Sequence, residues 1–328
     1  MKVLDKDIPR IGMGCWAIGG PFSAGNESWA YSNTNDKQSE RAIRAALDTG
    51  VRIFDTAPAY GAGHSERLLG NALKDQHDAL VVTKLGISID SDRRKVVGED
   101  TNADNVETAV DASLKRLQRE RIDILLLHLN SLSIDKAGAI FSAMEKAVQA
   151  GKVRTFGWST DYPASVESMT NLPNFTVVEH GMNIFMDVPT IQSAVESKGL
   201  LALIRSPLAM GVLTGKYDAS SRMPENDIRS SDAQWMEYFE NGRPSHDYLA
   251  NLDNIRELIC SDGRTLAQGA LCWLLAKCEF NLPVPGARTP EQALENAGAI
   301  QAGPLPENIM HEIEALIDRT PEGLPRDR

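Results

Sequence analysis

The chain has 328 residues, of which 42% are hydrophobic and 24% charged, a composition typical of a globular protein with a large core rather than of a disordered chain. Its 34 Lys and Arg against 45 Asp and Glu give a formal net charge of -11, which argues against a protein that binds nucleic acid or an anionic membrane. The four cysteines show neither CxxC pairs nor histidines at zinc-finger spacing, so we expect no disulfide framework and no metal site.

The N-terminal segment, MKVLDKDIPRIGMGCW, contains Lys, Asp and Pro among its apolar residues and does not resemble a secretory signal. Nowhere do about eighteen apolar residues follow one another, which is the length that a membrane-spanning helix needs. We therefore expect a soluble, cytoplasmic protein without a nucleic-acid or membrane partner. The sequence does not predict its oligomeric state.

Eight short apolar runs, rich in Val, Ile, Leu and Phe, recur along the chain. In chain order they lie at residues 11–17, 51–55, 79–85, 122–128, 153–159, 175–180, 200–206 and 281–286. Each run is too brief for a helix. Its apolar character is continuous rather than alternating, which is typical of strands that are buried on both faces of a parallel sheet.

Segments with helical periodicity lie between these runs, at residues 36–48, 65–74, 104–117, 136–149, 188–198, 265–276 and 290–299. Several end near a glycine, such as Gly50, Gly151 and Gly199, where a left-handed cap is easiest. The alternation of strand and helix around eight strands favours a closed (β/α)8 TIM barrel over an open doubly wound sheet. We expect residues 1–328 to form a single barrel domain.

A long segment, residues 206–248, follows the seventh predicted strand. It is polar and charged (SSRMPENDIRSSD) and also carries the aromatic residues Trp235, Tyr238 and Phe239. In a barrel such a loop lies at the C-terminal face, where active sites form, so it is a candidate lid or specificity element. A surface loop without any chemical role is equally consistent with its composition.

Four chemically active side chains stand at or just after the ends of predicted strands. Asp55 ends the second run, and Tyr60 follows it in the segment DTAPAYG. Lys84 and His128 end the third and fourth runs. Each alone has an ordinary structural explanation, such as a helix cap or a satisfied core histidine. Because the carboxyl ends of barrel strands converge on one pocket, the four together predict an active site.

These four residue types suit the delivery of a proton to a carbonyl oxygen. A free tyrosine has a pKa of about 10 and protonates an alkoxide poorly at neutral pH. Lys84 supplies a cation that stabilises the Tyr60 phenolate, and Asp55 can hold that ammonium in an ion pair. His128 can donate a hydrogen bond that orients a substrate carbonyl. The site is therefore suited to carbonyl reduction, provided that a hydride donor lies opposite.

Ordered motifs along nearly the whole chain resemble those of the aldo-keto reductase superfamily. They are GMGCW (12–16), DTAPAYG (55–61), SERLLG (65–70), VVTK (81–84), DILLLH (123–128), GKVRTFGWS (151–159), SPLAMGVLTGKY (206–217) and PGARTPEQALEN (285–296). The resemblance implies a (β/α)8 barrel closed at its bottom by an N-terminal hairpin, here residues 2–11. It also implies NAD(P)H-dependent reduction of aldehydes or ketones, or oxidation of a sugar or alcohol in reverse.

The resemblance further implies a role for each matching residue. Asp55, Tyr60, Lys84 and His128 match the catalytic tetrad, with Tyr60 as the general acid and nicotinamide C4 as the hydride source. Together with Trp29 and Met182, which the loops around the pocket suggest, the candidate substrate-site residues are Trp16, Tyr60 and His128. The implied cofactor-site residues are Gly14, Cys15, Trp16, Asp55, Ser159, Thr160, Glu179, Arg205, Ser206, Pro207, Leu208, Gly211, Lys216, Gly286, Arg288, Gln292, Glu295 and Asn296.

Three positions around the nicotinamide site depart from the family pattern. Thr160 replaces an Asn after Ser159, and Thr lacks the geometry of an amide. Glu179 replaces a Gln, and an ionised Glu can only accept from the carboxamide NH2. Arg205 replaces a stacking aromatic, and its cation would disfavour the oxidised nicotinamide relative to the reduced form.

The last motif bears on the choice of cofactor. Gly286, Ala287 and Gln292 stand where the smaller, well-known reductases carry Lys, Ser and Arg around the adenosine 2′-phosphate. Arg288 remains at the start of the predicted helix, and its guanidinium fork suits a phosphate monoester. We therefore expect NADP(H) in preference to NAD(H).

Two other functions remain open at this stage. Barrels of this kind also serve as nucleotide-binding regulatory subunits of membrane channels, with little turnover. A redox-free barrel could instead use Lys84 to form a Schiff base, as aldolases do. The identity of the small-molecule carbonyl or sugar substrate does not follow from the sequence.

Overall fold

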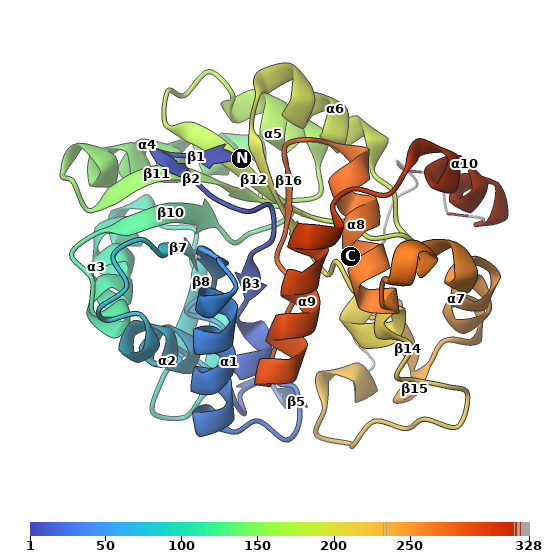
Figure 1. Ribbon diagram of the computed structural model, residues 1–328. Helices are drawn as coiled ribbons and strands as arrows, with labels where there is room; N and C mark the ends of the chain where they lie inside the picture. The colour runs from blue at the N-terminus through green and yellow to red at the C-terminus, as the bar shows by residue number, and fades with distance from the viewer. Residues whose placement is uncertain (232, 234, 318, 320–321, 323–328) are drawn as a thin grey trace.

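The computed structural model describes residues 1–231, 233, 235–317, 319 and 322. Eight parallel strands form one sheet in the order β16, β13, β12, β11, β10, β7, β6, β3. A parallel bridge between Gly14 and Gly286 joins its two edge strands, and Gly12 N–H donates to the Pro283 carbonyl at 2.9 Å. The predicted (β/α)8 barrel is confirmed (Figure 1).

Each of the eight predicted runs coincides with one barrel strand, and only β12 extends past its run, by one residue. The strands are β3 (Met13–Gly14), β6 (Ile53–Asp55), β7 (Leu80–Leu85), β10 (Ile122–Leu127), β11 (Val153–Ser159), β12 (Phe175–Gly181), β13 (Leu201–Arg205) and β16 (Asn281–Pro283). The outer helices that match the predicted segments are α1 (Asp36–Asp48), α2 (His64–Ala72), α3 (Val106–Leu117), α4 (Ile134–Gln149), α6 (Pro189–Lys198), α8 (Leu266–Lys277) and α9 (Pro290–Ala302).

Three helices lie outside the predicted segments: α5 (Pro163–Met169), α7 (His246–Ile259) and α10 (Glu307–Leu316). In α7, Leu252, Ile255 and Ile259 are buried at steps of three and four residues. That spacing is the signal of an amphipathic helix, so α7 could have been found at the end of the long polar segment. None of the described helices has the length and apolarity needed to cross a membrane.

The inside of the barrel is filled by an apolar cluster that includes Val82, Ile124, Leu126 and Leu282. The hairpin of β1 (Lys2–Val3) and β2 (Lys6–Asp7) adds Val3 and Ile8 to the same cluster. The N-terminal hairpin therefore covers one end of the barrel, as predicted, and leaves the other end as the place for a site.

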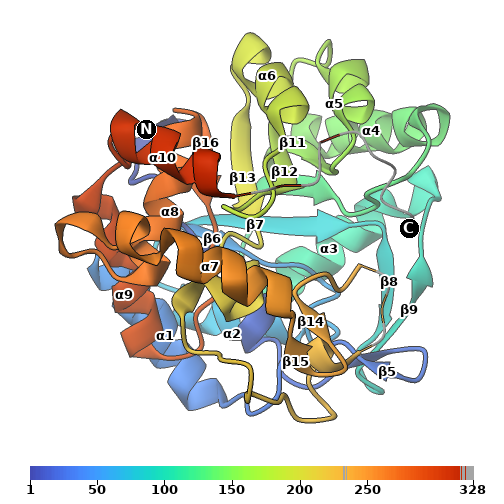
Figure 2. The same cartoon turned by 90° about the vertical axis from the view of Figure 1, so that its right-hand side faces the viewer.

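Structures that the sequence did not predict surround the carboxyl ends of the strands. The strands β4 (Ser23–Ala24), β5 (Glu27–Ser28), β8 (Ile87–Asp90) and β9 (Lys95–Glu99) form a separate four-stranded sheet. The 206–248 segment holds two 3-10 turns, Ala209–Thr214 and Ile228–Ser230, and the small hairpin of β14 (Phe239–Glu240) and β15 (Arg243–Pro244). Figure 2 shows β8 and β9 standing beyond the head of the β7 arrow, at the open end of the barrel.

Candidate active site

Alternation along the strands places the predicted catalytic residues inside the barrel. In β7, Leu80 and Val82 belong to the inner apolar cluster, so Lys84, two residues further on, also points inward. In β6, Ile53 belongs to the same cluster, and Asp55 follows with the same parity. The interior of the barrel is therefore apolar along most of its length and becomes polar at the carboxyl ends of the strands.

The same parity applies to β10 and β12. Ile124 and Leu126 point inward and are followed by His128, while Val177 points inward and is followed by Glu179. These four strands therefore bring their inward-facing side chains to one layer at the carboxyl end of the barrel.

Lys84 lies at the centre of the polar layer and is 1% exposed. Its ammonium forms an ion pair with Asp55 and donates to the Thr56 carbonyl at 3.0 Å. It also donates to the Tyr60 hydroxyl at 3.4 Å and lies 5.1 Å from the centre of the Tyr60 ring. Phenol, ammonium and carboxylate therefore meet at one point, as the sequence predicts.

Tyr60 and His128 are only partly buried and stand above that ion pair, toward the mouth. Their rings are 6.0 Å apart and nearly perpendicular, at 89°. Burial, joined by repulsion from Lys84 and Arg205, holds the pKa of His128 well below its ordinary value, so its imidazole is neutral at pH 7. A neutral imidazole still has one N–H to donate.

Burial raises the pKa of Tyr60 above its ordinary value; Lys84 lowers that pKa and the nearby carboxylates raise it further. The phenol therefore keeps its proton at neutral pH, as a general acid must. The lowering of the Tyr60 pKa by Lys84, expected from the sequence, is present but is outweighed by desolvation.

Two carboxylates hold Lys84 in its charged form. Burial opposes the ammonium, but Asp55 and Glu179 outweigh it and raise the pKa of Lys84 above its ordinary value. Schiff-base formation needs a neutral amine with a lowered pKa, so the geometry disfavours the aldolase-like alternative.

Glu179 faces the tetrad, a contact that the sequence did not predict. Its Oε2 lies 3.1 Å from Lys84 Nζ, and its Oε1 accepts a hydrogen bond from the Ser159 hydroxyl at 3.1 Å. Both residues had been expected to bind the nicotinamide carboxamide. In this structure they bind each other instead, because Ser159 and Glu179 are paired neighbours in the register of β11 and β12.

The hydroxyl of Thr160, which was expected to bind the carboxamide, is bonded to neighbouring backbone groups in this structure. Its hydroxyl donates to the Asn130 carbonyl at 2.7 Å and accepts from the Tyr162 N–H. Since a hydroxyl has one proton, Thr160 has no donor left for a cofactor.

Arg205 is the last residue of β13, at the carboxyl end of the strand, and forms an ion pair with Asp161. Asp161 also accepts from the Gly181 N–H at 2.8 Å, which fixes its carboxylate. The Arg205 charge that was expected to act on the nicotinamide is therefore offset by a partner that the sequence analysis missed.

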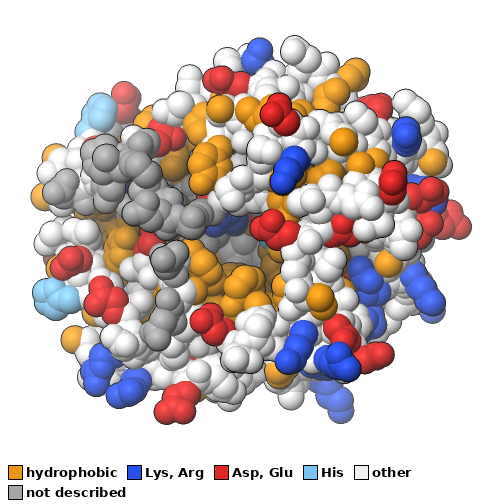
Figure 3. Space-filling view, turned by 180° about the vertical axis from the view of Figure 1, so that it is seen from behind, with side chains coloured by type: hydrophobic (Ala, Val, Ile, Leu, Met, Phe, Trp, Pro, Cys, Tyr) orange, Lys and Arg blue, Asp and Glu red, His pale blue; other side chains and the backbone are white. Residues whose placement is uncertain are grey.

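Aromatic side chains from three segments line the mouth beside Tyr60. The Trp16 ring lies 6.0 Å from that of Tyr60 with an interplanar angle of 20°. Trp235, from the 206–248 segment, lies 6.2 Å from both Trp16 and Trp29, and the Trp16 indole donates to the Trp29 carbonyl at 3.0 Å. The long segment therefore does reach the candidate site. Figure 3 looks onto this open end of the barrel and shows a hollow with hydrophobic side chains along part of its edge.

Met182 was expected at the substrate site, and the structure contradicts this. Its side chain is 0% exposed and packs in the outer core beneath the helices. The reason is parity: Glu179 and Gly181 face inward, so Met182 faces outward.

A cluster of cations lies beside the mouth, among residues after β13 and β16. Desolvation by the surrounding protein and repulsion from Arg229 and Arg288 lower the pKa of Lys216 to about 8, although part of its side chain stays exposed. Asp227 pairs with Arg229 at 2.7 Å, and Glu295 offsets little of the remaining charge. The cluster thus holds an excess of positive charge that an anion would relieve, which fits the phosphates of a dinucleotide.

Sequence reasoning predicted Lys216 and Arg288 in this cluster but missed Arg229. The Arg229 guanidinium lies 5.0 Å from the Tyr31 ring, and that of Arg288 lies 6.0 Å from it. Arg288 also donates to the Ser32 carbonyl. The segment NDIRSS around Arg229 has no spacing that would have indicated a site.

The other predicted cofactor residues lie around the same end of the barrel. Gly14 and Gly286 pair across the barrel seam, and the loop of Ser206, Pro207, Leu208 and Gly211 follows β13 directly. At the start of α9, Gln292 accepts from the Arg288 N–H, and Asn296 donates to the Gly286 carbonyl at 3.4 Å; Glu295 lies beside it. The Cys15 side chain points into the core, where burial raises its pKa, and its backbone N–H and carbonyl are hydrogen-bonded to Asp55 and Ser65.

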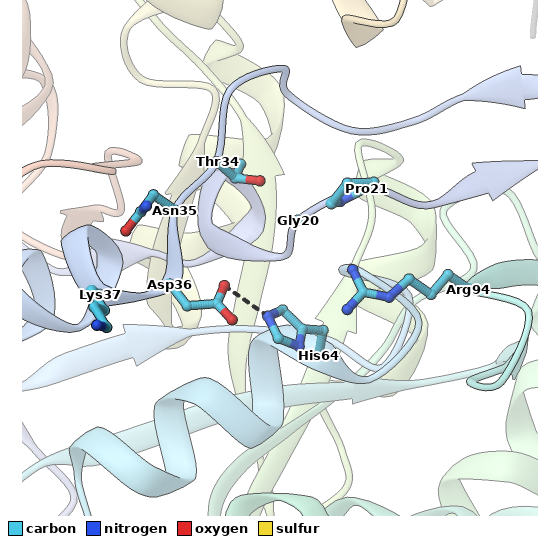
Figure 4. Close-up of a pocket in the computed structure, with 8 residues that line it drawn as sticks. All are labelled: Gly20, Pro21, Thr34, Asn35, Asp36, Lys37, His64 and Arg94. Carbon is cyan, nitrogen blue, oxygen red and sulfur yellow. Dashed lines mark hydrogen bonds and ion pairs between the residues drawn. The ribbon is translucent and has the colours of Figure 1, made fainter.

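A separate cavity of about 480 Å³ lies between the starts of α1 and α2. It is lined by Gly20, Pro21, Thr34, Asn35, Asp36, Lys37, His64 and Arg94 (Figure 4). His64 Nε2 and Asp36 Oδ1 are hydrogen-bonded across it at 3.0 Å. None of the tetrad residues lines this cavity, so it is distinct from the candidate active site.

Comparisons with known proteins show the family to which the chain belongs. The model of the aldo/keto reductase family matches residues 10–318, so the chain belongs to that family of oxidoreductases acting on carbonyl and alcohol substrates. Aldo-keto reductase YhdN of Bacillus subtilis (strain 168) is 28% identical over 323 residues, covering 96% of this chain and 91% of that protein. The aldo-keto reductase yakc (NADP(+)) of Schizosaccharomyces pombe is 26% identical, covering 97% and 91%. The structure of a glycerol dehydrogenase from Gluconobacter oxydans is similar with a TM-score of 0.78 and 27% identity, covering 98% of this chain and 97% of that one.

Proposed function

We propose that this protein is an NADP(H)-dependent aldo-keto reductase that reduces an aldehyde or ketone to an alcohol, or catalyses the reverse oxidation. The observation that carries the proposal is the contact of the Tyr60 hydroxyl with Lys84 at 3.4 Å, directly above the Asp55 ion pair. This is a protonated phenol beside a fixed cation, at the open end of a barrel. Membership of the family supports the same reaction class.

The chain's own residues then act on the carbonyl oxygen of the substrate. The neutral His128 donates a hydrogen bond that orients the carbonyl, and Tyr60 gives its proton to the oxygen as negative charge develops there. Lys84 stabilises the resulting phenolate, and Asp55 keeps the ammonium in place. A bound nicotinamide cofactor would supply the hydride.

The proposal is tested with a panel of aldehydes, ketones and aldoses, by following the absorbance of NADPH and, separately, of NADH. We expect carbonyl-dependent loss of NADPH absorbance. A protein that binds NADPH but turns over no member of the panel would favour the regulatory alternative. The panel should include glyceraldehyde and dihydroxyacetone, since one structural relative is a glycerol dehydrogenase, together with aromatic aldehydes that suit the tryptophan-lined mouth.

Replacing Arg288 with Ala should weaken the binding of NADPH far more than the binding of NADH. We propose that Arg288 binds the 2′-phosphate, and one hydrogen bond to a charged group contributes about 1.5–3 kcal/mol, which corresponds to roughly 10- to 100-fold in Kd. The check is a fluorescence titration of both cofactors. Arg243→Ala, an exposed arginine on β15, is the matched control. Equal losses for NADPH and NADH would contradict the role.

The Arg205–Asp161 pair should set the relative affinity for oxidised and reduced cofactor. In Asp161→Asn, the Arg205 charge loses the carboxylate that offsets it. We therefore expect the NADP+ affinity to fall relative to that of NADPH, and Arg205→Tyr to shift the ratio the other way. The measurement is the ratio of the two Kd values in each variant. An unchanged ratio in both would remove this pair from cofactor selection.

A further inference from the structure

The polar layer inside the barrel holds more acid than base. Asp55 and Glu179 are 4% and 1% exposed, and both face Lys84, which is 1% exposed. If all three were ionised, this group would carry a net charge of -1 away from water. Burial of an uncompensated charge is costly, and buried acids usually take up a proton instead.

The other charged and titratable groups around this layer do not supply the missing cation. On β13, Arg205 is paired with Asp161. His128 is held neutral, because its pKa is far below its ordinary value through burial and the nearby Lys84 and Arg205. Tyr60 and the thiol of Cys15 keep their protons, since burial raises the pKa of each.

One oxygen of Glu179 is placed to share a proton. Its Oε1 accepts from Ser159, while its Oε2 is buried and has no hydrogen-bond donor among the described residues. Lys84 Nζ lies 3.1 Å from Oε2, close enough for an ion pair but not aligned as a hydrogen bond. Asp55 and Glu179 both contact the same Lys84 ammonium, which brings the two buried carboxyl groups together on one side chain.

The titration of Asp55 agrees with this arrangement. Burial and the adjacent Glu179 raise the pKa of Asp55 to about 8, against the opposing effect of Lys84. The pair therefore retains one proton at neutral pH and loses it as the pH rises through about 8.

We propose that Glu179 and Asp55 share one proton, and that Lys84 passes this proton to Tyr60 after each reduction. The proposal rests on the proposed function in one respect, because it takes Tyr60 to be the general acid. Glu179 acts on Tyr60 only through Lys84, so it is a positioning residue rather than a catalytic one.

The proton transfer is balanced and involves no redox change. After reduction Tyr60 is a phenolate. A Lys84 N–H bond breaks as the Tyr60 O–H bond forms, and the shared O–H bond of the carboxyl pair breaks as a new Lys84 N–H bond forms. The pair, now doubly ionised, takes up a proton from solvent before the next turnover.

The first test is the pH profile of carbonyl reduction in Glu179→Gln. In the wild type we expect kcat to decline as the pH rises through about 8, where the pair loses its proton. In the variant, Asp55 faces only Lys84. The decline in kcat should therefore disappear between about pH 7 and 9, and the value of kcat at pH 7 should fall about tenfold. Glu145→Gln, a partly buried glutamate bonded to Asn174, is the matched control and should keep the wild-type profile. A variant with the wild-type midpoint would overturn the relay.

The second test reads the shared proton without any turnover. Infrared difference spectra of the cofactor-free protein, taken between pH 6 and 10, should show a protonated carboxylic acid that disappears with a midpoint of about 8. The signal should be lost in Glu179→Gln and retained in Glu145→Gln. Its absence from the wild type would overturn the shared proton. If the signal is present but no carbonyl is reduced, the proposed function fails while the carboxyl pair stands.

Discussion

Tyr60→Phe should lower kcat for carbonyl reduction by about 10²- to 10⁴-fold, the contribution typical of a positioned general acid. The change removes the proton that the Tyr60 hydroxyl holds and leaves the Lys84–Asp55 ion pair in place. The ring that stacks on Trp16 is also retained, so the wall of the mouth should keep its shape. The measurement is steady-state reduction of the best panel substrate, with the NADPH Kd determined in parallel.

The cofactor affinity separates a chemical effect from a structural one. NADPH should bind to Tyr60→Phe about as tightly as to the wild type, since the hydroxyl gives its proton to the substrate. Tyr162→Phe is the control, because Tyr162 is 40% exposed and belongs to no part of the site. A Tyr60→Phe protein with near-normal kcat would remove Tyr60 from the mechanism.

Lys84→Met should be the most destabilising change in the site, by about 3–5 kcal/mol, the cost of leaving buried charges without their partner. Asp55 and Glu179 would both lose the ammonium that faces them. In the folded variant, the two carboxyl groups can avoid a buried charge by binding protons. In the unfolded chain, the same groups are ionised at any pH above their ordinary acidic pKa values. The folded variant then binds more protons than the unfolded one, so its stability should fall further as the pH rises. Activity should also be lost.

The double variant Lys84→Met with Glu179→Gln tests the cause of that loss. It removes one of the two carboxylates as well, so part of the lost stability should return. Urea unfolding of the wild type, both single variants and the double variant gives the coupling energy. A double variant as unstable as the sum of the two single changes would show that Lys84 and Glu179 do not interact.

The barrel and its tetrad followed from the sequence because both depend on local patterns. Continuous apolar runs separated by amphipathic segments determine which residues form strands and helices. Alternation along a strand determines which of its residues point into the barrel. Asp55 and Lys84 stand at inward positions at the ends of neighbouring strands, so they are expected to meet. His128 at the end of the fourth run and Tyr60 just after the second followed from the same pattern, and the family resemblance then gave each residue its role.

The side-chain contacts between neighbouring strands did not follow from the sequence, because they depend on register. Nothing in the sequence pairs Glu179 with Lys84 or Asp161 with Arg205, since each pair joins distant segments. Met182 was expected in a loop at the pocket, but it directly follows β12 and packs in the outer core, a packing contact that no sequence pattern indicates. Arg229 and Trp235 lie in a polar segment with no periodicity, and only the fold brings them to the mouth.

The most direct measurement follows the hydride itself in a single turnover. Enzyme in excess is mixed with NADPH carrying deuterium at the transferred C4 position and with a carbonyl substrate, and the alcohol is analysed by mass spectrometry. We expect deuterium on the alcohol carbon, and we expect Tyr60→Phe to form this alcohol about 10²- to 10⁴-fold more slowly. Alcohol without deuterium, or transfer at an equal rate in the wild type and Tyr60→Phe, would contradict the proposed mechanism.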